Sequence, residues 1–156
     1  MTEKILSAGE CSRCQRCCIF ESYELRLTPA VDDILAGRAK QLRPDVRFAD
    51  VDGRRLFMML PIGNDMFACP MLDREKGCML GEDKPPECDM FPFVLTECGG
   101  RRAVAVSSAC PIMSERSLRQ LEETARELSS QLFLIADRRP ELVRRYEKGY
   151  TVLVTE

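Results

Sequence analysis

Cysteine is the residue of this chain that is best suited to chemistry, and all nine cysteines lie between positions 11 and 110. Residues 11–18 read Cys-Ser-Arg-Cys-Gln-Arg-Cys-Cys. Spacings of two residues let a tight loop aim several thiolates at one centre, as in zinc knuckles and bacterial ferredoxins. The intervening residues are Ser, Arg and Gln rather than core residues, so we interpret Cys11, Cys14 and Cys17 as metal ligands and not as packed thiols.

Cys18 has several open roles, because its side chain diverges from that of the adjacent Cys17. It can bind a second metal, bridge two metals or act as a redox thiol. We place it with the candidate ligands, and it is also the best single candidate for a catalytic or redox residue. A thioredoxin-like pair is disfavoured here, because residues 1–10 offer no strand before the first CxxC.

Further cysteines occupy residues 69–92, a stretch rich in Gly and Pro that is expected to be irregular backbone. It has too few apolar residues to order itself, and a bound metal would supply the ordering energy. We therefore add Cys69, Cys78 and Cys88 to the candidate ligands. A bacterial ferredoxin run ends in Cys-Pro, and this chain has such dipeptides beginning at Cys69 and at Cys110.

The composition excludes several classes of function. With 156 residues, 45% hydrophobic and 31% charged, the chain is expected to be globular rather than disordered. It has no His, which rules out Ser-His-Asp and Cys-His catalysis, Cys₂His₂ zinc fingers and Rieske centres. The net charge of −2 argues against a general nucleic-acid binder. We find no GxGxxG or P-loop motif, so the question of enzymatic activity stays open.

The sequence shows no membrane span or signal peptide, which favours a cytoplasmic location. No run of about 18 apolar residues predicts a membrane span, and residues 1–7 lack the apolar core of a signal peptide. We therefore expect a cytoplasmic protein without membrane contact, in a compartment that keeps thiols reduced. In that setting nine cysteines, an odd number, indicate metal ligands or redox chemistry rather than a disulfide framework.

The elements expected to position the cysteines are short. Thr28-Pro29 is typical of a helix start, and we predict a helix from there to Ala39. Residues 41–53 are expected to be a loop that ends in an Asp-Gly turn. Cys98, beside a Gly-Gly turn, is as readily a plain thiol as a ligand. Strands are predicted over 54–60 and 66–69, and a hairpin over 93–96 and 102–106.

The part of the chain after the last cysteine has helical periodicity. Ser117 with Gln120 fits a capping box, and we predict further elements at 140–148 (a helix) and 150–154 (a strand). The apolar stripe of the first helix is expected to pack on its own domain, the alternative being a partner protein. Its members follow three- and four-residue spacings: Leu118, Leu121, Ala125, Leu128, Leu132 and Ile135.

The chain is therefore predicted to be a single α+β domain over residues 1–156. It should be a small, irregular, metal-organised fold with short β-hairpins and C-terminal helices. Within it, residues 11–111 form the cysteine-cluster, metal-binding region, and residues 114–149 form the helical C-terminal segment.

The order of the cysteines resembles that of the YkgJ-type cysteine-cluster family, whose members are described as zinc- or iron-chelating. The family's hallmark, CxxCxxCC near the N-terminus, matches residues 11–18. After the hallmark, the family has further motifs in a fixed order. These are a helix start, two cysteine loops, an Arg-Pro-like pair, a Cys, a Phe-Pro and a late Cys. They match at Leu27-Thr28 with Asp32, Cys69 to Asp73, Gly77 to Leu80, Lys84-Pro85, Cys88, Phe91-Pro92 and Cys110.

The resemblance covers about residues 11–111 and leaves the helical tail out. Gln15, Gly81 and Lys84 stand where the family usually has Gly, an aromatic residue and Arg, which affects loop geometry more than metal binding. The resemblance implies a metal-cluster domain but no assigned biochemical role. The candidate ligand set is Cys11, Cys14, Cys17, Cys18, Cys69, Cys78, Cys88 and Cys110.

Thiolates without imidazole suit three arrangements: one [4Fe–4S] cluster with the other cysteines structural, two four-cysteine centres, or two Cys₄ zinc sites. The CxxCxxC run with a remote Cys-Pro favours iron–sulfur, used in electron transfer, redox sensing or cluster handling with a protein partner. The alternative is a structural zinc domain that acts as a protein-interaction module. Arg13, Arg16 and Lys84 can offset cluster charge, although ordinary solvated surface is the simpler interpretation.

Overall fold

The computed structural model describes residues 1–21 and 28–156 and has an α+β fold, which confirms the predicted class. The chain forms two compact units. We call residues 8–88 the Cys-rich unit, and residues 1–7 with 89–156 the C-terminal unit. Among the described helices, none combines the length and the apolar character needed to cross a membrane.

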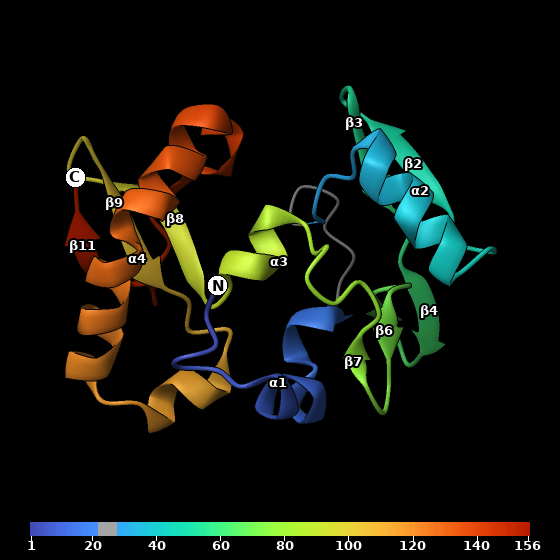
Figure 1. Cartoon of the computed structure of the whole chain (residues 1–156), viewed down its shortest axis with the longest axis horizontal. Coiled ribbons are helices and arrows are strands. Elements are labelled where there is room, and N and C mark those ends of the chain that lie inside the picture. Colours follow the sequence, from blue (N-terminus) through green and yellow to red (C-terminus); the bar gives the residue numbers. More distant parts are fainter. Residues whose placement is uncertain (22–27) are drawn as a thin grey trace. The chain divides into compact units, whose positions relative to one another are not determined.

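The Cys-rich unit is built from short elements joined by tight turns (Figure 1). Its helices are α1 (Ala8–Cys14), the 3₁₀ turn η1 (Arg16–Cys18) and α2 (Asp33–Leu42); α3 (Pro86–Met90) spans the boundary between the units. Its strands are β1 (Ile19–Phe20), β2 (Phe48–Val51), β3 (Arg54–Phe57), β4 (Leu60–Gly63), β5 (Met66–Ala68), β6 (Leu72–Asp73) and β7 (Gly77–Cys78). They pair antiparallel as a three-stranded sheet β1-β5-β4 and as the hairpins β2-β3 and β6-β7.

A hydrophobic cluster supports the cysteine loops of this unit. Its buried members are Val31, Ala36, Ala39, Val46, Phe57, Met59, Met71 and Leu80. Partly buried Cys69 and Cys78 pack against the cluster. Two cysteine-bearing segments are therefore held by apolar burial, whose contribution is about 25 cal/mol for each Å² removed from water.

The predicted helix start at Thr28-Pro29 is wrong. The helix α2 begins at Asp33, and the side chain of Asp32 caps it by accepting a hydrogen bond from Leu35 N at 2.8 Å. Before it, Ala30 forms a β-bridge with Leu56, and Val31 N donates to Arg55 O at 2.8 Å. Pairing with a remote strand therefore keeps the backbone extended where local signals favour a helix.

The strands predicted over residues 54–60 and 66–69 form in part, because the first range is divided between β3 and β4. The strand β3 pairs with β2, which lies in the expected loop, across a turn in which Asp52 and Gly53 have φ of 50° and 74°. The strand β5 pairs instead with β4 and β1. The stretch 69–92, expected to be irregular, contains β6, β7 and α3, each of five residues or fewer.

The C-terminal unit contains longer and more regular elements. They are β8 (Phe93–Cys98), β9 (Arg101–Val106), η3 (Pro111–Glu115), α4 (Leu118–Arg138), η4 (Pro140–Leu142), β10 (Arg144–Arg145) and β11 (Thr151–Thr155). The sheet order is β10-β8-β9-β11, and Figure 1 shows α4 beside β8, β9 and β11, which it contacts. The predicted hairpin and terminal strand are confirmed, with Cys98 at the end of β8 opposite Arg101.

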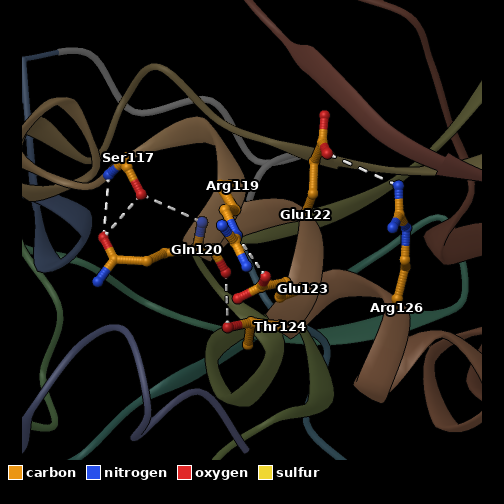
Figure 2. Close-up of polar contacts among 7 residues, drawn as sticks. All are labelled: Ser117, Arg119, Gln120, Glu122, Glu123, Thr124 and Arg126. Atoms are coloured by element: carbon orange, nitrogen blue, oxygen red, sulfur yellow. Dashed lines mark hydrogen bonds and ion pairs between the residues drawn. The ribbon is translucent and has the colours of Figure 1, made fainter.

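The helix α4 begins as its sequence predicts. Figure 2 shows the capping box: Ser117 Oγ accepts from Gln120 N at 3.2 Å, and Ser117 N donates to Gln120 Oε1 at 3.1 Å. Leu121, Ala125 and Leu132 of the apolar stripe are buried. Leu128 and Ile135 are partly buried, and Leu118 is 54% exposed, so the middle of the stripe packs on its own sheet while its first residue does not.

The predicted second C-terminal helix over residues 140–148 is wrong. Only the 3₁₀ turn η4 forms there, and β10 follows it in parallel pairing with β8. Thr96 Oγ1 also donates to Arg144 O at 3.0 Å, so a buried hydroxyl of β8 holds the segment extended.

Candidate metal centre

The structure divides the eight predicted ligands between the two units. Seven of them belong to the Cys-rich unit: Cys11, Cys14, Cys17, Cys18, Cys69, Cys78 and Cys88. Cys110 is a buried residue of the C-terminal unit that precedes η3, and Cys98 belongs to that unit too. Participation of Cys110 in a common site therefore stays a prediction.

The CxxCxxCC run forms a short helix followed by a tight reversal, rather than an open loop. Cys11 and Cys14 lie three residues apart on α1, which places them on one helix face. The backbone of Gln15 is left-handed, with φ of 53° and ψ of 6°, and it turns the chain so that Cys17 returns towards Cys11. The Cys11 and Cys17 thiols are hydrogen-bonded, and Cys17 Sγ lies 3.9 Å from Cys18 Sγ.

Gln15 also ties this run to the β6–β7 hairpin. A left-handed backbone costs a non-glycine residue roughly 1–2 kcal/mol. Here the Gln15 side chain offsets the cost, because its Nε2 donates to Ser12 O and to Arg74 O, both at 2.7 Å. These hydrogen bonds connect two cysteine-bearing segments.

The β6–β7 hairpin places Cys78 beside α1. Gly77 has φ of 86°, and a Cβ at this position would lie 3.0 Å from Ser12 Cβ. Asp73 fixes the turn, because its Oδ1 accepts hydrogen bonds from Glu75 N at 2.9 Å and Lys76 N at 2.8 Å. The close approach thus depends on a residue without a side chain directly before Cys78.

Cys69 is hydrogen-bonded through both its backbone and its thiol. Its N–H donates to Cys18 O at 2.8 Å, which extends the β1–β5 pairing. The Met71 N–H donates to the Cys69 thiol. Burial raises the pKa of Cys69 to about 11; the Met71 hydrogen bond lowers it, Cys78 and Cys17 raise it, and the positive charge of Arg43 lowers it.

Cys88 lies in α3, directly after Glu87, whose carboxylate contacts other parts of the unit. Ala30 N donates to Glu87 Oε1 at 3.4 Å, and Arg54 Nη2 lies 3.9 Å from the same oxygen. Arg54 Nε and Glu87 Oε2 are buried without a hydrogen-bond partner among residues 1–21 and 28–156. The Cys88 residue keeps an exposed surface, yet the many protein atoms around its thiol desolvate it and raise its pKa, and repulsion from Cys69, Cys17 and Cys78 adds to the effect.

These contacts define a group that we call the thiol cluster: Cys11, Cys17, Cys69, Cys78 and Cys88. Its members affect one another's charge state; the pKa of Cys11 is raised by the hydrogen bond that its S–H donates to Cys17, by desolvation and by repulsion from Cys17, while Lys84 lowers it. Like charges at close range oppose ionisation, and a bound cation reverses that effect. The donor chemistry therefore fits a thiophilic metal such as zinc or an iron–sulfur cluster.

The cluster gathers thiols without forming a coordination geometry. Over the described ranges, 1–21 and 28–156, no three Cys, Asp or Glu side chains converge closely enough to hold a metal ion as they stand. The side chains of the thiol cluster would have to turn towards one another to share a metal. All nine cysteines lie in the described ranges and are thiols rather than disulfides, so none is locked against such a change.

Two cations act on the cluster, and sequence reasoning found one of them. Lys84 was among the predicted charge-offsetting residues, whereas Arg13 and Arg16 are exposed residues. Arg43 was missed, because it ends α2 far from any cysteine motif. Its contact with the Cys69 loop becomes visible only in three dimensions.

No protein-family model, no curated protein and no solved structure matches this chain. The resemblance to the YkgJ-type family therefore depends on the order of the cysteines and the short motifs between them.

Proposed function

We propose that this protein is a metal-binding cysteine-cluster protein of the YkgJ type. One observation carries the proposal: the thiol cluster draws cysteines from α1, η1, the end of β5, β7 and α3 into one neighbourhood. Ionised thiols repel one another, so a gathering of this kind is favourable when a cation is bound. The hydrogen bond from Met71 to Cys69 supports a thiolate at that position.

An iron–sulfur cluster, in a [4Fe–4S] form, is the metal group that we favour. The CxxCxxC run and the remote Cys69-Pro70 dipeptide support it. Such a cluster supplies one-electron redox chemistry when bound. The protein would then work in electron transfer, redox sensing or cluster handling, with a protein partner, in the cytoplasm, where thiols stay reduced.

Structural zinc is the second candidate, and the size of the elements favours it. The strands β1, β6 and β7 have two residues each, so the regular backbone pairing of the Cys-rich unit is limited. A metal bound by thiolates contributes folding free energy directly to a unit of this kind. In that case the protein would act as an interaction module, with a surface other than the buried stripe of α4.

Metal and acid-labile sulfide analysis of protein purified without oxygen separates the two candidates. Iron with sulfide supports the iron–sulfur proposal, and zinc without sulfide supports the structural alternative. Cys69→Ser should lower the bound metal severalfold, whereas Cys98→Ser serves as the matched control and should retain it. Protein that holds neither metal, under conditions in which its thiols titrate as reduced, overturns both candidates.

A further inference from the structure

Arg43 makes a long-range contact with the loop that carries Cys69. Its backbone closes α2, where Arg43 N donates to Ala39 O at 2.8 Å. Its side chain crosses to that loop, and Nη1 donates to Pro70 O at 2.7 Å. Asp45 holds the guanidinium from the other side, with Oδ1 at 3.3 Å from Nε. The side chain is thus fixed at two points.

The Pro70 carbonyl and the Met71 N–H belong to the same peptide group. In a planar trans peptide these two groups point in opposite directions. Arg43 therefore donates a hydrogen bond to the carbonyl of this peptide, while the N–H of the same peptide donates to the Cys69 thiol. A charged donor on the carbonyl also polarises the amide and strengthens the N–H as a donor, since hydrogen bonds in a chain reinforce one another.

We propose that Arg43 is a positioning residue that acts through the Pro70–Met71 peptide to orient the Cys69 loop for metal binding. The inference rests on the proposed metal-binding function. It assigns to Arg43 the fixing of the Pro70 carbonyl, and with it the direction of the Met71 N–H beside the Cys69 sulfur. Outer groups of this kind commonly change metal affinity by about 10–100-fold.

Cobalt(II) is the probe for the test, because its thiolate complexes absorb in the near ultraviolet and visible range. Metal-free, reduced protein would be titrated with Co²⁺ in the absence of oxygen. Arg43→Gln should weaken Co²⁺ binding by about tenfold. Arg47→Gln is the matched control; it removes the same charge from an exposed residue four positions later and should bind Co²⁺ as the original chain does.

The absorption spectrum at saturating Co²⁺ separates positioning from a general loss of structure. A hydrogen bond to sulfur lowers the energy of the thiolate electrons, so its weakening should move the sulfur-to-cobalt charge-transfer band of Arg43→Gln to longer wavelength. Arg43→Lys keeps the positive charge but loses the planar guanidinium group. Its Co²⁺ affinity and band position should therefore lie between those of Arg43→Gln and the original chain.

Each outcome has a defined meaning. If the original chain binds no Co²⁺, and holds neither iron with sulfide nor zinc after purification without oxygen, the proposed function fails. If the original chain binds Co²⁺ and Arg43→Gln matches Arg47→Gln in both affinity and spectrum, the role of Arg43 fails while the proposed function stands. Should Arg43→Gln not fold, Arg43→Lys decides, because affinity and spectrum equal to those of the original chain would overturn the inference.

Discussion

The two units are stabilised in different ways. In the C-terminal unit, β8 and β9 pair over six residues each, and α4 covers the sheet with a buried apolar stripe. Arg102 adds ion pairs to Asp137 and to Glu156, each with an N–O distance of 2.6 Å. In the Cys-rich unit, strands of two to four residues are joined by turns, single hydrogen bonds and cysteine contacts.

This contrast indicates which unit a bound metal would stabilise. Long ladders and a packed helix give the C-terminal unit stability that does not come from the thiol cluster. The Cys-rich unit gathers thiols that would repel one another once ionised, and a bound cation favours their ionised form. We therefore expect a cation to contribute a large share of the stability of this unit. Changes to the metal should therefore act on one unit, and changes to apolar packing in α4 should act on the other.

Metal removal should have the largest effect. We expect chelation to abolish amide-exchange protection over residues 8–88, while β8, β9 and α4 keep theirs, because structural thiolate sites supply folding free energy directly. Hydrogen exchange followed by mass spectrometry would resolve the two units. Equal loss of protection in both units would show that the contrast drawn here is wrong.

Leu132→Ala should have the next largest effect, in the opposite unit. Leu132 is completely buried on α4, and its truncation leaves a cavity that costs about 2–5 kcal/mol. We expect denaturant unfolding to show this loss for the C-terminal unit. The bound metal for each chain should stay unchanged, and Leu134→Ala, at a residue that is 46% exposed, is the control with a small effect on both.

The same contrast explains what the sequence could predict. In the C-terminal unit, the capping box at Ser117, the stripe through Leu121 and Leu132 and the Gly-Gly hairpin are local signals, and the structure confirms them. The predicted helix over 140–148 fails there, because parallel pairing of Arg144 with Thr96 depends on a strand far away in the sequence.

In the Cys-rich unit, the residue types predict candidate metal ligands, but the sequence does not predict where those residues lie in space. The eight candidate ligands follow from cysteine spacing, the Gly/Pro-rich context and the family resemblance. None of these reveals that Gly77 packs against Ser12 or that Arg43 reaches Pro70. The start of α2 was missed for the same reason, since Ala30 pairs with Leu56. Local patterns therefore supply the prediction of metal binding, and long-range contacts decide how the cysteines are arranged.

Gly77→Ala should have a moderate effect that is confined to the Cys-rich unit. The new Cβ would meet Ser12 at 3.0 Å, and φ of 86° costs an alanine about 1–2 kcal/mol, so Cys78 should shift away from α1. We expect lower stability and weaker metal binding. Gly37→Ala is the matched control, because this helical glycine has open space around its Cβ position and should gain about 1 kcal/mol.

Substitutions of Gln15 should have the smallest effects on stability, and alanine and glycine at this position should differ from each other. Gln15→Ala keeps the left-handed backbone and loses both hydrogen bonds, each of which contributes about 1 kcal/mol, so it should lower the stability of the Cys-rich unit. Gln15→Gly loses the same bonds but relieves about 1–2 kcal/mol of backbone strain, so it should lie close to the original chain. Thermal unfolding of the metal-bound protein would rank them. If the two variants were equally destabilised, the backbone at this position would not be strained.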